Sequence, residues 1–416
     1  MKVDVLVYAS WYPLEQPQLM GLLSAGYLKG KESFSFEFDT SWLKKKNIPR
    51  LDPDLPLVHG KSFPQSRRTL FGIFSDAAPD RWGRRLMSRR EKVMARREER
   101  PERPLMELDF LLGVDDSGRM GALRFKRELS GPFLEDDRES PAPPITDLRK
   151  LEHASMLLEH GDSAKVEEAL AILLRPGGSL GGARPKANVL DPSGSLWIAK
   201  FPSASDDIDV GGWEEVTASL ARAAGISVSE SKAVKLGSKH HTFLTRRFDR
   251  WGSNIRYAYA SALTLLGKRD GDSHESSYLD IAEVIISQCT TPKAQLHELW
   301  RRIVFSIIVS NADDHLRNHG FLYDFAKNGW TLSPAFDVNP VQGSGGLTLS
   351  IDENDNSLDL DLARSVAPYF QIEKTDADQI IQQLLAVRKG WRPLAKKVGI
   401  KSAEIDQMAS VFEAER

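Results

Sequence analysis

The stretch Ser310-Asn-Ala-Asp-Asp-His-Leu-Arg-Asn-His-Gly-Phe-Leu-Tyr323 gathers two adjacent carboxylates, amides and imidazoles in one short segment. An apolar run from Leu299 to Val309 precedes the segment and is expected to be a helix, and a short apolar run after it is expected to be a strand. A carboxylate can accept a proton from a hydroxyl group, and carboxylate and amide oxygens can bind Mg²⁺. The segment is therefore a candidate reaction centre.

The spacing of the acid and the amide in this stretch indicates one kind of chemistry. Asp313 and Asn318 stand five positions apart, as do the proton-accepting Asp and the metal-binding Asn of the kinase catalytic loop H-R-D-x-x-x-x-N. A second metal ligand is expected on a nearby segment. In Leu332-Ser-Pro-Ala-Phe-Asp-Val-Asn-Pro340, Asp337 takes the place of the metal-binding Asp of D-F-G. Alone, the spacing can arise by chance and Asp337 can be a turn residue.

Composition narrows the class of protein. The chain has 416 residues, a net charge of −2 and a single cysteine, Cys289. This length suffices for two or three domains, and the near-zero charge does not indicate a nucleic-acid binder as a whole. One cysteine excludes an internal disulfide and is typical of a reducing compartment. The first residues read as a strand, and no apolar run reaches membrane-spanning length, so we expect a cytoplasmic protein.

A glycine-rich stretch, Gly177-Gly-Ser-Leu-Gly-Gly-Ala-Arg-Pro-Lys186, is the second informative segment. Glycines let a backbone approach a phosphate, and successive amide groups can form an anion-binding nest. Ser179 adds a hydroxyl group and Lys186 adds a cation. The stretch lacks the G-K-[ST] of a Walker A loop. By itself, such a stretch is more often only a turn.

Lys200 follows this stretch in the second of two expected strands, at 187–190 and 196–201. In a kinase, a strand lysine after the glycine-rich loop pairs with the α- and β-phosphates, although a strand lysine can also simply reach solvent. A helix expected over 212–224 places Glu214 and Glu215 in its first turn. Glu214 is the favoured ion-pair partner of Lys200; the alternative is that both acids complement the helix dipole.

Further strands are expected at 229–236 and 241–247, and Arg246 to Asp249 would form a hinge whose backbone contacts adenine. In the first part of the chain, 3–8 and 34–38 read as strands, and 19–28 as a loop or a short strand broken by glycines. Asp80 is a plausible N-cap for a helix that continues into the basic run 84–103. That run could bind phosphates or an acidic partner, but its interleaved acids favour a solvated face.

The order of the elements predicts the architecture. A Pro- and Gly-rich segment, 130–144, marks a boundary, and helices are expected at 147–160, 164–174, 261–267, 278–288, 376–387, 392–398 and 402–415. Strands early and helices late indicate a two-lobed α+β fold. We expect an N-terminal subdomain at 1–127, a kinase N-lobe with the glycine-rich loop at 128–250, and a helical C-lobe with the catalytic and metal-binding loops at 251–416.

Together these motifs resemble those of the HipA family, the serine/threonine kinase toxins of bacterial type II toxin–antitoxin modules. The resemblance is carried by Ser179–Lys186, Ala199–Phe201, Arg247–Asp249, Asn311–Asn318 and Ala335–Pro340. It extends over nearly the whole chain, because residues 74–80 are similar to the N-terminal subdomain of the family. It implies a protein-kinase-like fold with an N-terminal β-rich subdomain and a helical C-lobe.

The resemblance also implies roles for individual residues. Asp313 would be the catalytic base, Asn318 and Asp337 would hold Mg²⁺, and Lys200 would bind phosphate. The remaining residues implied in ATP binding are Ser179, Gly181, Gly182, Ala183, Lys186, Arg246, Arg247, Phe248, His315 and Arg317. Ser179 would be an autophosphorylation site whose phosphate silences the kinase. Arg317 stands where a lysine is expected, and its guanidinium keeps the charge but cannot donate a proton.

The function expected from this resemblance is an ATP- and Mg²⁺-dependent kinase that phosphorylates a translation protein such as an aminoacyl-tRNA synthetase. The expected partners are a HipB-like helix-turn-helix antitoxin and, mainly through it, operator DNA. One alternative is a catalytically weak protein that acts as a co-repressor partner, and another is a kinase for a small molecule or lipid. The sequence names neither the target nor the oligomeric state.

Overall fold

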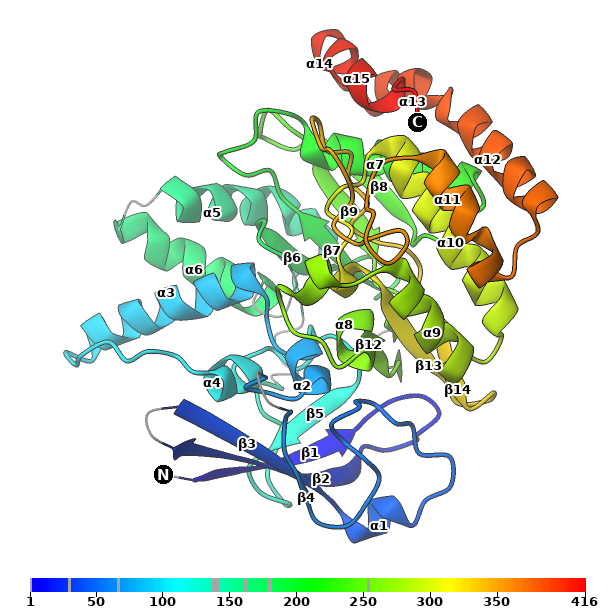
Figure 1. Ribbon diagram of the computed structural model, residues 1–416. Coiled ribbons are helices and arrows are strands. Elements are labelled where there is room, and N and C mark those ends of the chain that lie inside the picture. Colours follow the sequence, from blue (N-terminus) through cyan, green and yellow to red (C-terminus); the bar gives the residue numbers. More distant parts are fainter. Residues whose placement is uncertain are drawn as a thin grey trace. The chain divides into compact units, whose positions relative to one another are not determined.

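The computed structural model describes residues 2–28, 31–65, 68–136, 142–160, 163–177, 182–252 and 255–416 (Figure 1). Its contacts divide the chain into two compact units. The N-terminal unit contains residues 1–205, 236–238 and 249–260, and the C-terminal unit contains 206–235, 239–248 and 261–416. The first holds most of the strands and the second is mainly helical, which confirms the expected α+β class. The division into three domains at 127 and 250 stays a prediction.

The N-terminal unit contains an antiparallel five-stranded sheet in the order β4-β3-β2-β1-β5. Its strands are β1 (Val3–Ala9), β2 (Gln18–Leu28), β3 (Lys31–Phe38), β4 (Lys61–Ser62) and β5 (Leu123–Lys126). β1 and β3 confirm the predictions at 3–8 and 34–38. β2 is one continuous strand, so its glycines do not end it. A Cβ at Gly21 would lie 2.3 Å from the Glu37 carbonyl oxygen, and this glycine therefore permits close approach of β3.

The N-terminal unit also contains several helices and a second, smaller β structure. They are α1 (Thr40–Leu43), α2 (Gly72–Asp76), α3 (Arg81–Arg97), α4 (Glu107–Leu112), η1 (Ile145–Asp147), α5 (Leu148–His160), α6 (Ser163–Gly177), β6 (Lys186–Leu190), β7 (Leu196–Lys200), β10 (Arg250–Trp251) and β11 (Ile255–Arg256). β6 and β7 form an antiparallel hairpin. Both strands were predicted from their apolar residues and the turn between them.

The basic run over α3 is largely compensated within the N-terminal unit. Arg84 makes two hydrogen bonds of 2.7 Å to Glu107, and Arg103 pairs with Asp109 at 2.8 Å. Arg100 pairs with the buried Glu91, and this contact holds the pKa of Glu91 at about 2. These ion pairs support the interpretation of the run as mainly a solvated, internally paired face.

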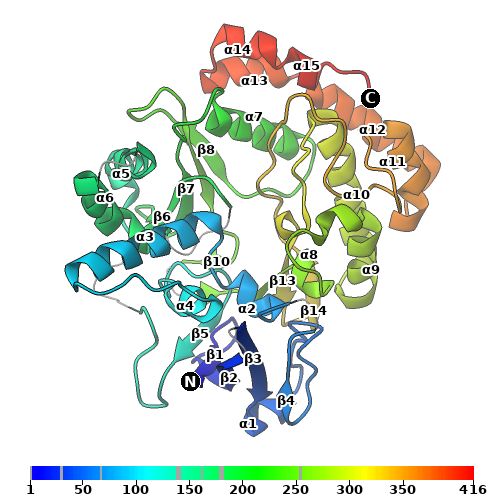
Figure 2. The same ribbon diagram turned by 60° about the vertical axis from the view of Figure 1, so that its left-hand side comes forward.

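The C-terminal unit is organised around α10 (Pro292–Val309), which is almost completely buried from Leu299 onward except at Arg301. Figures 1 and 2 show α9, α11 and α12 beside it. The elements of this unit, with β12 at the boundary, are α7 (Val210–Ala223), β8 (Ser231–Val234), β9 (Thr242–Arg246), β12 (Tyr259–Ser261), α8 (Ala262–Leu265), η2 (Asp272–Glu275), α9 (Tyr278–Gln288), η3 (Leu316–Asn318), β13 (Gly320–Asp324), β14 (Gly329–Leu332), α11 (Leu360–Val366), η4 (Ala367–Phe370), α12 (Lys374–Arg388), α13 (Trp391–Val398), α14 (Ser402–Gln407) and α15 (Ala409–Phe412).

Helix α7 begins earlier than the sequence indicated. The Asp209 carboxylate caps the helix by accepting a hydrogen bond from the Gly212 amide, so the first helical residue is Val210. Glu214 and Glu215 consequently lie in the second turn, and the prediction that they occupy the first turn was wrong. This position weakens the alternative in which both acids serve mainly to complement the helix dipole.

None of the helices in the described ranges combines the length and the hydropathy that crossing a bilayer demands.

Candidate active site

The loop after α10 starts with a sharp change in chain direction. Ser310 adopts a left-handed conformation with φ of 54° and ends the helix. Non-glycine residues seldom adopt this conformation, and it is held here by the Asn311 amide, which donates to the Ser306 carbonyl at 2.9 Å. The chain beyond this point runs over the end of α10 and carries both candidate acids.

The two adjacent acids have opposite environments. The Asp313 side chain is exposed, whereas Asp314 is buried. Asp314 accepts hydrogen bonds from the Tyr278 hydroxyl at 2.6 Å and the Ser306 hydroxyl at 3.3 Å, and forms a 3.1 Å ion pair with His319. Asp313 is therefore the accessible acid of the two, and its role as the base stays a prediction.

These contacts explain the electrostatics around Asp314. Burial opposes ionisation of this carboxyl, but the charge of His319 and the Tyr278 hydrogen bond outweigh burial, and the pKa of Asp314 lies below its usual range. Burial and the Asp314 charge both raise the pKa of Tyr278 well above its ordinary value. Asp314 is thus an ionised carboxylate that accepts hydrogen bonds inside the C-terminal unit.

Asn318 is tied to the backbone of the candidate base. It lies at the end of η3, is buried, and donates from Nδ2 to the Asp313 carbonyl oxygen at 3.1 Å. The role of its Oδ1 atom as a metal ligand stays a prediction. The five-residue spacing noted in the sequence therefore corresponds to a closed turn that joins Asp313 to Asn318.

The segment that contains Asp337 lies next to this turn. Asp337 has a positive φ of 59°, and Asn339 donates from its backbone amide to Asn311 Oδ1 at 3.0 Å. A pocket is lined from both sides, by Asn311 and Asn318 and by Phe336. The structure thus brings together the loop of Asp313 and the segment of Asp337, which are distant in the sequence.

A hairpin in the N-terminal unit carries the two candidate phosphate-binding lysines. Lys186 in β6 stands directly opposite Lys200 in β7, so both side chains leave the same face of the hairpin. A Cβ at Gly182 would lie 2.5 Å from Lys186 Nζ, so this ammonium group lies against the backbone of the glycine-rich stretch. Two cations opposite each other favour binding of an anion at this face.

The described end of the glycine-rich stretch is anchored to α3. The Gly182 amide donates to the Asp80 carboxylate, and the Trp82 indole donates to the Lys186 carbonyl oxygen at 3.0 Å. Asp80 does occupy the N-cap position of α3, as predicted, but its side chain makes no hydrogen bond to the helix. Ala183 is exposed. The predicted ATP-binding residues Ser179 and Gly181 lie outside the described residues.

Glu214 and Glu215 can be distinguished by their partners. Glu215 is bonded to Ser219 and Ser231 at 2.8 and 2.7 Å and to Arg222 at 2.7 Å. Glu214 is buried on the same helix. Glu215 is thus engaged within the C-terminal unit, and the ion pair between Glu214 and Lys200 stays a prediction.

The other predicted nucleotide residues of the C-terminal unit lie at its loops and strand ends. Arg246 ends β9 and approaches Glu230 at 4.0 Å, and Arg247 is buried. Phe248 packs against Phe336 with 5.3 Å between ring centroids. His315 is half-buried in the catalytic loop, and Arg317 makes a two-point contact with Asp270 at 2.6 and 2.9 Å. The guanidinium of Arg317 is thus oriented by the Asp270 carboxylate, and its role in nucleotide binding stays a prediction.

Sequence reasoning did not find three residues that shape the site. Tyr278, Ser306 and Asn311 support the catalytic loop from α9, from α10 and from the loop itself. Neither spacing nor composition indicates a functional role for Tyr278 or Ser306, because a single tyrosine or serine is common in amphipathic and apolar helices. Asn311 lies within the quoted stretch, but its buried position at the end of α10 becomes evident only in the structure.

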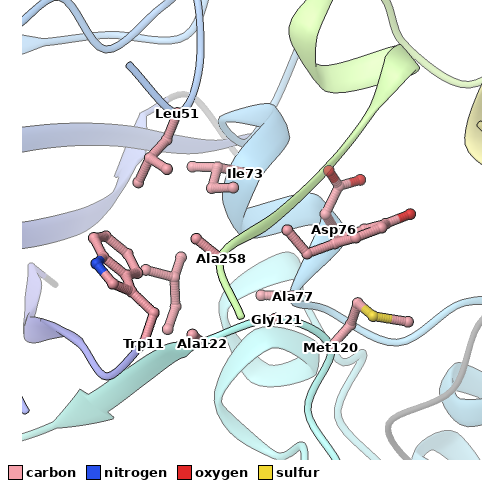
Figure 3. Close-up of a pocket in the computed structure, with 11 residues that line it drawn as sticks. Trp11, Leu51, Ile73, Asp76, Ala77, Met120, Gly121, Ala122 and Ala258 are labelled. Atoms are coloured by element: carbon pink, nitrogen blue, oxygen red, sulfur yellow. The ribbon is translucent and has the colours of Figure 1, made fainter. Parts of the chain in front are cut away.

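A second pocket lies in the N-terminal unit (Figure 3). Its walls are mainly apolar, with Trp11, Leu51 and Ile73 on one side and Met120 on the other, and Asp76 is its one carboxylate. None of the predicted site residues lines it. It contains no constellation of acid, base and amide that would indicate a reaction.

Comparison with known proteins agrees with this geometry. Residues 178–391 match the HipA-like C-terminal domain, and residues 19–124 match the HipA N-terminal domain. The chain belongs to the HipA family. HipA of Shewanella oneidensis MR-1, in a structure of the toxin–antitoxin complex of HipA, HipB and operator DNA, matches with a TM-score of 0.65 at 14% identity, over 98% of this chain and 95% of that chain. This likeness shows that the HipA-family chain has the kinase-like fold of that protein.

Two curated relatives cover a smaller part of the chain. The "Putative kinase" of Haemophilus influenzae is 31% identical over 147 residues, which are 31% of this chain and 40% of that protein. The "Putative kinase Y4dM" of Sinorhizobium fredii is 29% identical over 157 residues, 35% of this chain and 37% of that protein. The matches therefore span about two fifths of the length of these relatives.

Proposed function

We propose that this HipA-family protein is an ATP- and Mg²⁺-dependent kinase that phosphorylates a serine or threonine hydroxyl of another protein. The observation that carries the proposal is the closed turn between the exposed Asp313 and the buried Asn318, beside the segment of Asp337. Phosphoryl transfer requires mainly positioning and neutralisation of charge, and this arrangement offers a proton acceptor and two oxygen ligands together.

The donor set fits Mg²⁺. Asn318 and Asp337 would hold the ion through amide and carboxylate oxygens, which are the hard ligands that Mg²⁺ prefers. In the part of the chain that the structure describes, no group of three or more His, Cys, Asp or Glu side chains forms a metal site. Two protein ligands are consistent with an ion whose remaining positions are filled by phosphate and water. When bound, the ion would neutralise charge on the transferring phosphoryl group.

The residues proposed to bind ATP are the following. Lys186 and Lys200 offer cations to the phosphates, and Gly182 offers a backbone without a Cβ at the point where Lys186 approaches. Glu214 would orient Lys200. The backbone around Arg246, Arg247 and Phe248 would contact adenine, with Ala183, His315 and Arg317 completing the nucleotide site. The catalytic step assigned to Asp313 is acceptance of the substrate's hydroxyl proton.

Family membership supports the wider biological role. We propose that the protein is the toxin of a toxin–antitoxin module in the cytoplasm, inhibited by a HipB-like helix-turn-helix antitoxin that also binds operator DNA. The solved HipA structure to which this chain is similar is a complex with HipB and operator DNA. A translation protein such as an aminoacyl-tRNA synthetase is the proposed substrate, and autophosphorylation at Ser179 is the proposed mode of self-inhibition.

Intact mass and peptide mapping with and without Mg-ATP, beside the Asp313→Ala variant, test this proposal. Phosphate on Ser179 in the wild type and none in the variant is the expected result. Phosphate only at other residues would support kinase activity and contradict self-inhibition through phosphorylation of Ser179. A parallel incubation with cell lysate and with small-molecule acceptors identifies the substrate class. If the protein binds nucleotide but transfers phosphate to no acceptor, the proposal that it is a kinase is wrong, and a binding protein is the better interpretation.

A further inference from the structure

A series of hydrogen bonds, formed by side chains and by the backbone amide of Asn339, connects the loop of Asp313 to the segment of Asp337 inside the C-terminal unit. We call it the polar chain, and its members are Tyr278, Asp314, Ser306, Asn311, Asn339 and Asp337. The Tyr278 hydroxyl donates to Asp314 at 2.6 Å, and the Ser306 hydroxyl donates to the same carboxylate at 3.3 Å. Asn311 donates to Ser306 at 3.3 Å and accepts from the Asn339 backbone amide at 3.0 Å. Asn339 Nδ2 finally donates to Asp337 Oδ1 at 3.3 Å.

The centre of the polar chain is shielded from water. Ser306, Asn311 and Asp314 have exposed fractions of 3%, 2% and 5%. In such surroundings a missing hydrogen-bond partner is costly, because water cannot replace it. The geometry of these three side chains is therefore strongly determined, in contrast to the exposed side chain of Asp313.

Asn311 is the link that joins the two halves of the polar chain. Its Nδ2 donates to Ser306, which also bonds to the Asp314 carboxylate, and its Oδ1 accepts from the backbone of Asn339. A side-chain amide offers a donor and an acceptor at once, which this position requires. A backbone bond of 2.9 Å from the Val341 amide to the Ser310 carbonyl runs beside it. Loss of the Asn311 side chain should therefore loosen the contact without detaching the segment.

We propose that Asn311 is a positioning residue for phosphoryl transfer, which fixes the metal-binding Asp337 relative to the proton acceptor Asp313. The inference rests on the proposed kinase function and adds to it a residue that touches neither substrate nor metal. Asn311 acts through its two neighbours. It ties the backbone two residues after Asp337 to the end of the helix from which the loop of Asp313 departs.

The experiment compares Asn311→Ala with Asn356→Ala in the full chain. Asn356 is the control, since it is an exposed asparagine of the same unit whose amide donates to the Leu347 carbonyl at 2.6 Å. Misplacement of a reacting group by about 1 Å can lower a rate about 100-fold. We expect a fall in kcat of about this size for Asn311→Ala, a higher Mg²⁺ concentration for half-maximal rate, and a KM for ATP within about twofold of wild type.

A positioning role should raise the Mg²⁺ concentration for half-maximal rate while the KM for ATP stays nearly unchanged. A merely structural role should not produce this difference. Loss of folded protein would lower the amplitude of activity without moving the Mg²⁺ midpoint, and thermal unfolding of both variants measures that loss. If Asn311→Ala does not fold, Asn339→Ala carries the test, because it removes only the side-chain bond to Asp337. That variant should also need more Mg²⁺. An unchanged Mg²⁺ midpoint in a folded Asn311→Ala or Asn339→Ala protein overturns the inference.

Calorimetric binding of ADP with and without Mg²⁺ distinguishes failure of the inference from failure of the proposed function. A wild-type protein that transfers no phosphate contradicts the kinase, yet the inference still predicts that Asn311→Ala reduces the part of ADP affinity that depends on Mg²⁺. A wild-type kinase whose Asn311→Ala variant keeps both the rate and the Mg²⁺ dependence contradicts only the positioning role.

Discussion

The β6–β7 hairpin of the N-terminal unit and the loop 310–319 of the C-terminal unit place charged groups by different means. In the hairpin, strand register sets Lys186 opposite Lys200, and period-two alternation puts both side chains on one face. In the loop, Asp313 and Asn318 depend on a turn that is supported by buried side chains of α9 and α10. Local sequence is therefore sufficient to align the lysines, whereas the acids need the tertiary structure.

The comparison separates catalytic effects from effects on stability. The exposed side chain of Asp313 should be removable at little cost to folding. Asp314, which is bonded inside the unit, should be required for folding. The following substitutions test this contrast, beginning with the largest expected effect.

Removal of either candidate catalytic acid should nearly abolish transfer. Asp313→Ala removes the proton acceptor and Asp337→Ala removes a metal ligand, and we expect each to lower the rate by about 10³-fold or more. Transfer is measured with radiolabelled ATP at saturating Mg²⁺. Asp324→Ala, at the last residue of β13, is the control and should keep its activity. Full activity in both site variants would show that the loop is not the reaction centre.

The neighbouring Asp314 should have its main effect on folding. Asp314→Ala leaves the Tyr278 and Ser306 hydroxyls buried without their acceptor, and each buried donor left unsatisfied costs about 1–3 kcal/mol of unfolding free energy. Asp313→Ala, at an exposed position, should change that free energy by less than about 0.5 kcal/mol. Urea unfolding of both variants measures the difference. Equal losses would contradict the contrast between these adjacent acids.

Lys200→Ala should weaken nucleotide binding and leave folding intact. A charge-assisted hydrogen bond contributes about 1.5–3 kcal/mol, so we expect kcat/KM for ATP to fall about 10- to 100-fold. Lys232→Ala, at an exposed position in β8, is the matched control. An unchanged kcat/KM in Lys200→Ala would identify this residue as a strand lysine that only reaches solvent.

The smallest expected effect is on the pH dependence of stability. Because the pKa of Asp314 is lower in the folded protein than its usual value, its ionised form stabilises the fold. That contribution is complete above the unfolded pKa of about 3.9 and is lost as the pH falls through the folded value. The difference in unfolding free energy between wild type and Asp314→Asn should therefore narrow as the pH falls below about 5 and on through the lowered pKa of Asp314. A difference that widens in acid would mean that burial dominates and raises this pKa.

Much of the fold could be predicted because its signals are local. The apolar alternation of β1 and β3 and the helix from Tyr278 to Gln288 agree with the structure. β2 was missed because its glycines look like breaks when the close approach of β3 is unknown. The start of α7 was misplaced because Asp209 was not recognised as its cap.

The sequence by itself determined which residues could carry the chemistry, since the types and spacings of Asp313, Asn318, Asp337 and Lys200 are local properties of the chain. Only the tertiary structure decided which of two adjacent acids is accessible, and that Asn311 joins the two loops of the C-terminal unit. The physical reason is burial. A carboxylate or an amide makes contacts of this kind only where elements that are distant in the sequence exclude water around it.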